Sequence, residues 1–312
     1  MAKSRTGQLR KPFLHIHADD YGMNDGSCRR IEKCIHGGCL GGISVMPNGC
    51  LERGQLDEMD IPMAVHLNLV EGRPLTPPEE IPLLVGTDGY WKYSFFGLLL
   101  LSLGPRRKEM ARQVSLELRA QIAAVRKLLP GNAPVLLDSH QHTHMIPLIF
   151  HALLKIVEEE QLEVSYLRIP AEPIGPFLRE PSLYHTYQPV NMVKNAVLNF
   201  LWLFNRSAFR KSGIPTAMFC GILLSGHMDA DRVLKVFPHF VRLAQKRGCD
   251  LEFLFHPGYI KPGEEFLDSR KASFNAFYLS EGRKAESAAL RDARLCALAE
   301  QYRHETAAGC HT

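Results

Sequence analysis

Short runs of apolar residues recur along the chain, and several of them end in polar or glycine-containing turns. Runs rich in Val, Ile, Leu and Phe are typical of strands that are buried on both faces of a parallel sheet. The pattern predicts seven such strands. They lie near residues 13–18, 42–46, 63–69, 134–138, 164–169, 218–224 and 250–255.

Between several of these runs, apolar residues recur with the spacing of an α-helix. The clearest case covers residues 106–129, where apolar side chains recur every three or four positions from Met110 onward and Pro130 follows the last turn. Further helices are predicted over residues 147–160, 191–206, 229–247 and 283–303. Pro238 lies inside one of them and is expected to kink or split it.

The alternation of strands and helices predicts an α/β fold with a parallel sheet. About seven such strands fit a (β/α) barrel-like fold of the TIM type, and a doubly wound open sheet is the alternative. Because such folds use roughly 250 residues as one domain, residues 1–312 are expected to form a single domain, with a core at 12–303 and a frayed tail at 305–312. Residues 71–105, rich in Pro, Gly and aromatic residues, are expected to form a long insertion that covers a site.

Composition narrows the functional classes. The chain is 46% hydrophobic and 22% charged with a formal net charge of +4, which is ordinary for a globular protein. Its basic residues are scattered apart from the short group 106–108, so we expect no nucleic-acid partner. The longest apolar run, 95–103, is interrupted by Gly97 and Ser102 and falls far short of the roughly 20 residues of a membrane helix. We expect a buried or lid segment there, and no membrane partner.

The start of the chain and its cysteines suggest a compartment. Residues 1–12 are basic and polar, and no apolar stretch that resembles a secretory signal follows them. The eight cysteines are scattered and form no C-x-x-C pair, which favours reduced thiols over a disulfide framework. Both observations predict an intracellular, cytoplasmic protein, with the nucleus as the alternative.

Ionisable side chains gather at or near the ends of four predicted strands. Since the loops that leave the carboxyl ends of parallel strands converge on one face, these side chains are expected to share a site. They are Asp19 and Asp20 after the first strand, His66 in the third, Asp138, His140, His142 and His144 after the fourth, and His256 after the last. Two adjacent aspartates penalise each other's ionisation, and a bound cation would remove that penalty.

Each part of this set also has a purely structural interpretation. The strand-end aspartates could cap the next helix, His66 could be a core histidine with satisfied hydrogen bonds, and His256 could be a turn residue. The three imidazoles within 140–144 are different, because such a run directly after an aspartate is seldom needed for packing. The joint pattern favours a metal or catalytic site.

The residue types favour hydrolytic metal chemistry. Imidazole nitrogens and a carboxylate make a three-ligand site that keeps positions open for water and substrate, and a second carboxylate can accept a proton from that water. The sequence has no G-x-S-x-G elbow, P-loop, H-E-x-x-H helix or dinucleotide-binding fingerprint. A metal-dependent hydrolase is therefore predicted. A metal-dependent phosphoesterase and a non-catalytic binding protein are the alternatives.

At these residues the sequence resembles the YdjC-type carbohydrate deacetylases, the family that includes the chitooligosaccharide deacetylases. The matching motifs occur in the family's order across residues 12–300. They are His17-Ala18-Asp19-Asp20-Tyr21-Gly22, the strand around His66, Asp138-Ser139-His140-Gln141-His142-Thr143-His144-Met145, and Phe255-His256-Pro257-Gly258-Tyr259. Tyr21 replaces the usual Phe, and His17 replaces the Asn of several members. The cysteine count and the short basic start resemble an animal member.

The resemblance implies a barrel-like fold related to the polysaccharide deacetylases, and removal of acetyl groups from N-acetylated carbohydrates such as N-acetylglucosamine oligosaccharides. It also implies one divalent metal ion held by Asp20, His66 and His140, with Asp19 as the proton acceptor. Two imidazoles favour Zn²⁺ by ligand softness, whereas family descriptions assign Mg²⁺. The expected partner is a small carbohydrate, and a homodimer is the expected assembly.

The positions of four further residues relative to the predicted strands suggest catalytic and supporting roles. His256 ends a predicted strand and would face the same rim as Asp19, so it is expected to be the general acid that protonates the leaving nitrogen. Asp138 and either His142 or His144 are expected to support the ligands from behind.

Substrate contacts are also predicted from position. Arg168 and Asn48, each close to a strand end, could hold sugar hydroxyls, with a surface salt bridge and a turn residue as the respective alternatives. The insertion supplies aromatic rings that suit stacking on sugars. These rings belong to Tyr90, Trp91, Tyr93, Phe95 and Phe96.

Overall fold

Seven parallel strands form one sheet in the computed structural model, which describes residues 10–51, 56, 59–129 and 134–303. All seven predicted strands are confirmed, and several are shorter than predicted because their last residues belong to the loops of the site. Their bounds are β1 (Leu14–Tyr21), β2 (Ile43–Val45), β3 (Met63–Leu67), β4 (Val135–Ser139), β5 (Val164–Leu167), β6 (Met218–Cys220) and β7 (Leu251–Phe255).

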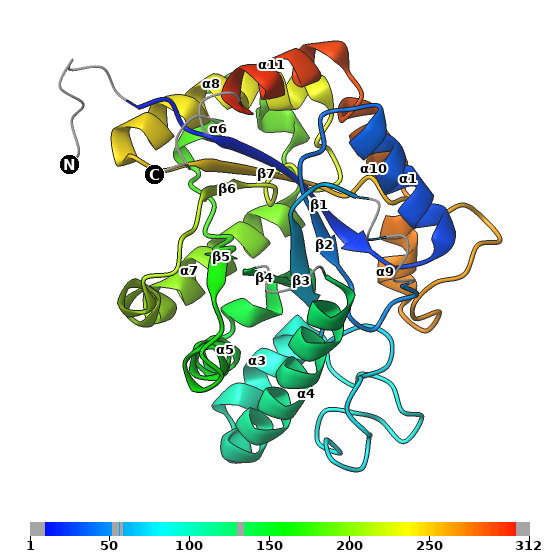
Figure 1. Cartoon of the computed structure of the whole chain (residues 1–312). Helices are drawn as coiled ribbons and strands as arrows, with labels where there is room; N and C mark the ends of the chain where they lie inside the picture. The colour runs from blue at the N-terminus through cyan, green and yellow to red at the C-terminus, as the bar shows by residue number, and fades with distance from the viewer. Residues whose placement is uncertain (1–9, 52–55, 57–58, 130–133, 304–312) are drawn as a thin grey trace.

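The sheet curls into a half-barrel with helices around it (Figure 1). Its strand order is β5-β4-β3-β2-β1-β7-β6, so successive strands advance in one direction, whereas a doubly wound sheet reverses at its centre. β5 and β6 are the two edges. The Leu167 N–H donates to the Pro215 carbonyl at 3.0 Å between the end of β5 and the segment before β6. The prediction of a distorted barrel is confirmed, and the doubly wound alternative is wrong.

Helices follow most of the strands. Their bounds are α1 (Asp25–His36), α3 (Phe95–Leu103), α4 (Arg107–Leu128), η1 (His140–Met145), α5 (Pro147–Glu159), α6 (Gly175–Leu178), η2 (Pro181–Thr186), α7 (Pro189–Ser212), α8 (Ala230–Arg247), α9 (Ala272–Tyr278), α10 (Glu281–Ala289) and α11 (Ala293–Arg303). The predictions of α4, α5, α7 and α8 are confirmed.

Two details of the helix prediction are wrong. Helix α8 runs through Pro238 without a split, because the buried side chains of Val236, Phe237 and Phe240 hold both halves against the sheet. The single helix expected over 283–303 is two helices, α10 and α11. The chain turns between them, where the Asp292 carboxylate accepts the Arg294 N–H at 2.8 Å and caps the second helix.

Helix α1 was not predicted, although its start is well specified. The Asn24 side chain accepts the Ser27 N–H at 2.7 Å, and the Ser27 hydroxyl lies 3.3 Å from the Asn24 N–H, which is a capping box. The buried face of α1 includes Ser27 and Arg30, so polar residues interrupt the apolar period that would reveal the helix.

Segment 71–105 is fixed by buried polar side chains of α4. Glu117 accepts the N–H groups of Leu75 and Thr76, and Gln113 accepts that of Leu83. The segment ends in α3, which packs on α4 but leaves much of its surface exposed. The run 95–103 is therefore half buried rather than buried.

Two further expectations concern cysteines and membranes. Cys28, Cys34, Cys50, Cys220, Cys249 and Cys296 are free thiols, as expected for a chain with reduced cysteines. Among the described helices, none combines the length and the apolar character needed to cross a membrane.

Candidate active site

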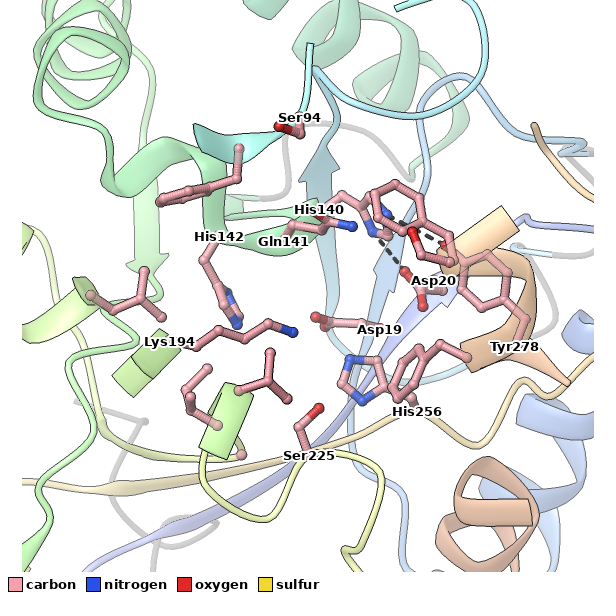
Figure 2. A pocket seen from close by; sticks show the side chains of 18 of the residues that line it. Asp19, Asp20, Ser94, His140, Gln141, His142, Lys194, Ser225, His256 and Tyr278 are labelled. Atoms are coloured by element: carbon pink, nitrogen blue, oxygen red, sulfur yellow. Dashed lines mark hydrogen bonds and ion pairs between the residues drawn. The ribbon is translucent and has the colours of Figure 1, made fainter. Parts of the chain in front are cut away.

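A cavity of about 480 Å³ opens where the carboxyl ends of the strands meet (Figure 2). Asp19, Asp20, His66, His140 and His256 all line it. They come from β1, β3, the turn after β4 and the turn after β7, which are far apart in sequence. The convergence expected from the strand ends is thus present in the structure.

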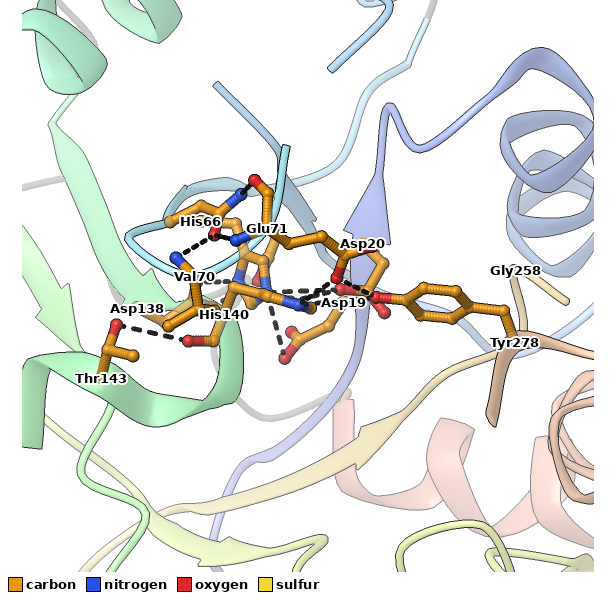
Figure 3. A network of polar contacts seen from close by, with 12 residues as sticks. Asp19, Asp20, His66, Val70, Glu71, Asp138, His140, Thr143, Gly258 and Tyr278 are labelled. Atoms are coloured by element: carbon orange, nitrogen blue, oxygen red, sulfur yellow. Dashed lines mark hydrogen bonds and ion pairs between the residues drawn. The ribbon is translucent and has the colours of Figure 1, made fainter. Parts of the chain in front are cut away.

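Asp20, His66 and His140 face one another closely enough to share an ion (Figure 3). Asp20 Oδ1 lies 3.0 Å from His140 Nδ1 and 3.5 Å from His66 Nε2. One possible ligand atom from each residue lies within 4.8 Å of the other two, and all three residues are buried. One carboxylate and two imidazoles on one side of a cavity leave room for water and substrate on the other.

The backbone turns sharply at Asp20. Its φ is 70°, in the left-handed region that residues with a side chain rarely adopt, and Gly22 follows at 103°. The register of β1 against β2 shifts between Ala18 and Tyr21. This irregularity lets Asp19 and Asp20 both face the cavity instead of pointing to opposite sides of the sheet. Strain of this kind concentrates at functional sites.

His66 is oriented by Asp138. The two residues are register partners on β3 and β4, and His66 Nδ1 donates to Asp138 Oδ1 at 2.6 Å. The Ser44 hydroxyl on β2 donates to the other carboxylate oxygen. With its Nδ1 committed, His66 presents Nε2 to Asp20. This is the carboxylate–imidazole support that metal-binding histidines commonly have.

His140 is held by a residue that the sequence analysis did not identify. Its Nε2 lies 3.0 Å from Glu71 Oε2, and its Nδ1 is left facing Asp20. The Tyr278 hydroxyl donates to the same Glu71 oxygen at 2.5 Å (Figure 3). Glu71 lies four residues beyond β3 and is fully buried, so it belongs to the site rather than to a surface loop.

Asp19 is held by Arg168 beneath the cavity. Arg168 Nη1 lies 2.9 Å from both Asp19 carboxylate oxygens and 3.0 Å from Asp138 Oδ2. Its Nε donates to Glu252 at 2.8 Å. These bonds fix the orientation of Asp19, and the guanidinium offsets part of the negative charge of three buried carboxylates, Asp19, Asp138 and Glu252.

The structure places Arg168 and Asn48 outside the lining of the cavity. Arg168 is 0% exposed, so it neither forms a surface salt bridge nor reaches a bound sugar in this conformation. The Asn48 amide donates at 2.9 Å to the carbonyls of both Glu71 and Arg73 and lies outside the cavity lining. It fixes the segment that carries Glu71. Both residues act inside the protein because their donors are already committed.

His142 and His144 have different positions. His144 lies 2.5 Å from Ser139 Oγ through Nδ1 and 2.9 Å from the Arg168 carbonyl through Nε2, so it links the ends of β4 and β5. His142 lines the cavity with its ring 5.7 Å from that of Phe219. Burial lowers the pKa of His144 to about 4, and burial together with Arg168 holds the pKa of His142 well below its ordinary value. Both rings are neutral at physiological pH.

His256 lies on the opposite wall of the cavity from His140 (Figure 2). Its backbone N–H donates to Glu286 at 2.5 Å, and its Nδ1 lies 3.5 Å from the same carboxylate oxygen. Its ring packs 5.7 Å from that of Phe277. Glu286 is fully buried, so it can fix the imidazole without competing for the substrate.

The ligand set carries surplus negative charge. Burial lowers the pKa of His66, but the carboxylates of Asp19 and Asp138 outweigh it and raise the pKa to about 10. Burial likewise lowers the pKa of His140, and Asp20 raises it to about 9. Without an ion, both imidazoles therefore hold an extra proton. A cation at this point would replace those protons.

The residues present fit one divalent ion. His66 Nε2 is buried and makes no hydrogen bond within the described residues, although it points toward Asp20. An ion between them would satisfy it. A second group of possible ligands, His17, Asp19 and Asp138, is close to the first, but the Arg168 guanidinium already contacts both aspartates there. The arrangement suits one ion rather than two.

Four residues that contact the candidate site were not predicted from the sequence. Buried ionisable residues far from the strand ends give no local signal, because their partners are specified only by the closed fold. Glu71 follows β3 closely enough that the strand-end argument could have found it. The four are Glu71, Tyr278, Arg283, which contacts Asp20, and Glu286.

The aromatic residues of segment 71–105 are divided between the cavity and the core. Phe95 and Phe96 line the cavity, as expected for a covering segment. Trp91 is 1% exposed and pairs with Val85 in an isolated bridge, so the expectation that it stacks on sugars is wrong. Tyr90 stacks against the guanidinium groups of Arg73 and Arg270 instead of facing the cavity.

The sequence profile of the YdjC-like protein family matches residues 13–301. The chain belongs to this family. Relatives named "Carbohydrate deacetylase" include one from Xenopus laevis, 29% identical over 81% of this chain and 83% of its own length, and one from Homo sapiens, 27% identical over 79% and 75%. A relative of the same name from Danio rerio is 26% identical over 52% of this chain, and the chain spans about half (51%) of its length.

A bacterial relative and a solved structure also resemble this chain. A Yersinia enterocolitica protein named "Chitooligosaccharide deacetylase" is 27% identical over 54% of this chain and 65% of its own length. The crystal structure of a putative cellobiose-phosphate cleavage protein from Enterococcus faecalis superposes with a TM-score of 0.65 at 17% identity, covering 94% of this chain and 96% of that one. At this identity, the likeness is one of fold.

Proposed function

We propose that this protein is a metal-dependent hydrolase that removes acetyl groups from N-acetylated carbohydrates, with oligosaccharides containing N-acetylglucosamine as its substrates. The observation that carries the proposal is the cluster of Asp20, His66 and His140 in one cavity with Asp19 and His256. The relatives' names, carbohydrate deacetylase and chitooligosaccharide deacetylase, support the same reaction.

Asp20 Oδ1, His66 Nε2 and His140 Nδ1 would hold the ion. A bound Mg²⁺ or Zn²⁺ would supply Lewis-acid activation of the acetamide carbonyl and of water. The chain prepares this site in advance, because Asp138 fixes the His66 tautomer and Glu71 fixes the His140 ring. The two imidazoles favour Zn²⁺ by softness, whereas the aspartate suits either ion.

Asp19 is the proton acceptor in this proposal. Arg168 holds its carboxylate in place, and its Oδ2 lies 3.8 Å from His66 Nε2, beside the ligand set. The carboxylate can therefore take a proton from the water that attacks the carbonyl carbon. Its neighbour Asp20 is committed to His140 and Arg283, so the two adjacent aspartates divide the roles of base and ligand.

His256 is the proton donor to the leaving amine. The C–N bond of an amide breaks only when the nitrogen is protonated, and a second group must supply that proton because Asp19 has just received one from the water. His256 lines the same cavity and is braced by Glu286. Phe95, Phe274 and Phe277 give the cavity aromatic walls on which sugar rings can pack.

Acetate release from short N-acetylglucosamine oligomers, measured together with bound metal, tests the proposal. We expect release that chelation abolishes and the divalent ion restores. Asp19→Asn should keep the metal and lose most of the rate. Metal retention with no acetate release from any oligomer would favour the non-catalytic carbohydrate-binding alternative, and hydrolysis of phosphate esters instead of acetamides would favour the phosphoesterase.

A further inference from the structure

Two helices beside the cavity leave apolar side chains exposed. On α3, Phe96, Leu100 and Leu103 are 53%, 71% and 76% exposed. On α7, the exposed set includes Val193, Phe200 and Phe204, which recur at helical spacing and so share one face. We call these six residues the apolar surface. Single exposed apolar residues are common, but two aligned rows of them indicate a surface that something covers.

The apolar surface adjoins the cavity. Phe96 at the start of α3 lines the cavity, and so do Lys194 and Val197 on the first half of α7. Helix α3 packs on α4, α4 on α5, and α5 on α7, and Figure 1 shows these four helices along one side of the sheet. The cavity therefore lies beside the first turns of both helices.

The charge on α7 and at the junction of α3 and α4 is mainly positive. Residues 94–108 contain Arg106, Arg107 and Lys108, and Glu109, the next residue of α4, pairs with Arg112. Helix α7 has Lys194, Arg206, Arg210 and Lys211 and no acidic residue among its 24. These seven cations exceed the formal charge of the whole chain, +4, so the remainder of the protein is slightly acidic.

The cations are available for a partner. All seven residues are exposed, although Lys194 lines the cavity, where burial lowers its pKa. None of the seven forms an ion pair with a carboxylate in the part of the chain that the structure describes. Helical spacing puts Lys211 on the same face as Phe200 and Phe204, whereas Arg210 lies about 100° around the helix from that face and Arg206 about 140°. An apolar face bordered by basic residues without acids is the composition of a helix that lies in a membrane interface.

We propose that the apolar surface and its seven cations dock the protein on the surface of an anionic lipid bilayer, with the cavity mouth toward the lipid. The inference goes beyond the proposed reaction and does not rest on it. It also replaces the composition-based expectation of no membrane partner, which considered only spanning segments. Helix α3, with nine residues, is too short to span, but its exposed leucines can enter the headgroup region.

Charge favours a bilayer over a second copy of the chain. A twofold interface brings the same patch of both copies together, so the cations of α7 would face cations, and α7 has no acidic residue to offset them. Anionic headgroups provide the opposite charge, and each Lys or Arg near such a surface strengthens binding by about 1 kcal/mol, or roughly fivefold.

Sedimentation of the full-length protein with vesicles tests the docking. We expect binding to vesicles of phosphatidylcholine mixed with phosphatidylglycerol, weaker binding to phosphatidylcholine alone, and loss of binding as salt is raised. Phe200→Ser with Phe204→Ser should lower the partition coefficient at least about tenfold. Arg206→Gln, Arg210→Gln and Lys211→Gln together should lower it on the order of a hundredfold.

Matched control variants distinguish docking through α7 from nonspecific attraction of the protein's positive charge to the vesicles. Arg242→Gln, Lys246→Gln and Arg247→Gln remove three exposed cations from α8, on the other side of the sheet, and should change binding little (Figure 1). Unchanged melting temperatures would show that every variant folds. Absence of binding to anionic vesicles, or equal losses in the α7 and α8 charge variants, would overturn the proposal. So would a dimer in light scattering that Phe204→Ser converts to monomer.

Discussion

Asp138 and His66 stand side by side on β4 and β3, and a 2.6 Å hydrogen bond joins the Asp138 carboxylate to His66 Nδ1. Asp138 therefore sets the orientation of His66, a proposed metal ligand, although Asp138 itself is not proposed to contact the ion. Asp138→Asn should therefore lower metal affinity by about 10- to 100-fold, the usual effect of losing such a partner. Titration of the metal-free protein, followed by calorimetry, measures the change.

The comparison variant for this prediction is Ser44→Ala. Ser44 also contacts Asp138, but it leaves the His66 hydrogen bond in place, so its effect on metal affinity should be smaller. Equal losses in Asp138→Asn and Ser44→Ala would indicate a general weakening of the strand ends rather than orientation of His66.

Removal of one ligand should empty the metal site. His66→Ala and His140→Ala each take away one of three protein ligands, and we expect the divalent ion to be lost while the fold remains. Elemental analysis with a thermal melt checks both points. Asp19→Asn is the contrasting variant, since it should retain the ion. Full metal occupancy in both histidine variants would contradict the assignment, and an empty site in Asp19→Asn would mean that the two aspartates exchange roles.

Metal binding should depend strongly on pH. The pKa values of His66 and His140, about 10 and about 9 without metal, lie above the ordinary value of about 6.5. Protonation of these residues thus stabilises the metal-free fold fully below about pH 6.5, and this stabilisation is lost as the pH rises through 9 and 10. The ion needs the unprotonated nitrogens, so its affinity should rise with pH over the same range.

Calorimetry in buffers of different ionisation enthalpy measures how many protons metal binding releases. Near neutral pH, binding should release close to two protons per ion, one from each imidazole. His140→Ala offers an internal check, because any weak residual binding should release about one proton fewer. Binding without proton release would show that the imidazoles are already neutral in the metal-free protein.

His256→Ala should slow amide hydrolysis about a hundredfold or more while keeping the fold and the metal, within the range of general acid catalysis. The loss should shrink for an activated acetate ester, whose leaving group needs no proton. A parallel assay on both substrates checks this. Equal losses on amide and ester would make His256 a positioning residue, and a large drop in melting temperature would indicate that it mainly braces the loop.

Replacing two aromatic residues of segment 71–105, Trp91 and Phe95, should affect two different properties of the protein. Trp91→Ala removes a core side chain and should lower the free energy of unfolding by about 3–5 kcal/mol with little effect on KM at temperatures where the protein is folded. Phe95→Ala changes the cavity wall and should raise KM for oligosaccharides. Denaturant melts and oligosaccharide kinetics on the two variants distinguish these effects, and the reverse result would place Trp91 at the substrate.

The sequence by itself determined the strands and the residues that follow them. A buried parallel strand is a short apolar run, and this property is local, so all seven runs were found along with the strand-end residues Asp19, Asp20 and His256. The order of the strands places those ends on one face, which is why sequence positions more than 200 apart could be assigned to one site.

Tertiary structure alone decided which buried groups surround those residues. Glu71, Tyr278 and Arg168 contact the site through hydrogen bonds across the closed fold, and a hydrogen-bond partner leaves no periodic trace in the sequence. The apolar faces of α3 and α7 also could not be assigned from the sequence as covered or exposed. Periodicity marks a helical face as apolar, but whether neighbouring elements cover that face depends on their packing, and here the structure leaves it exposed.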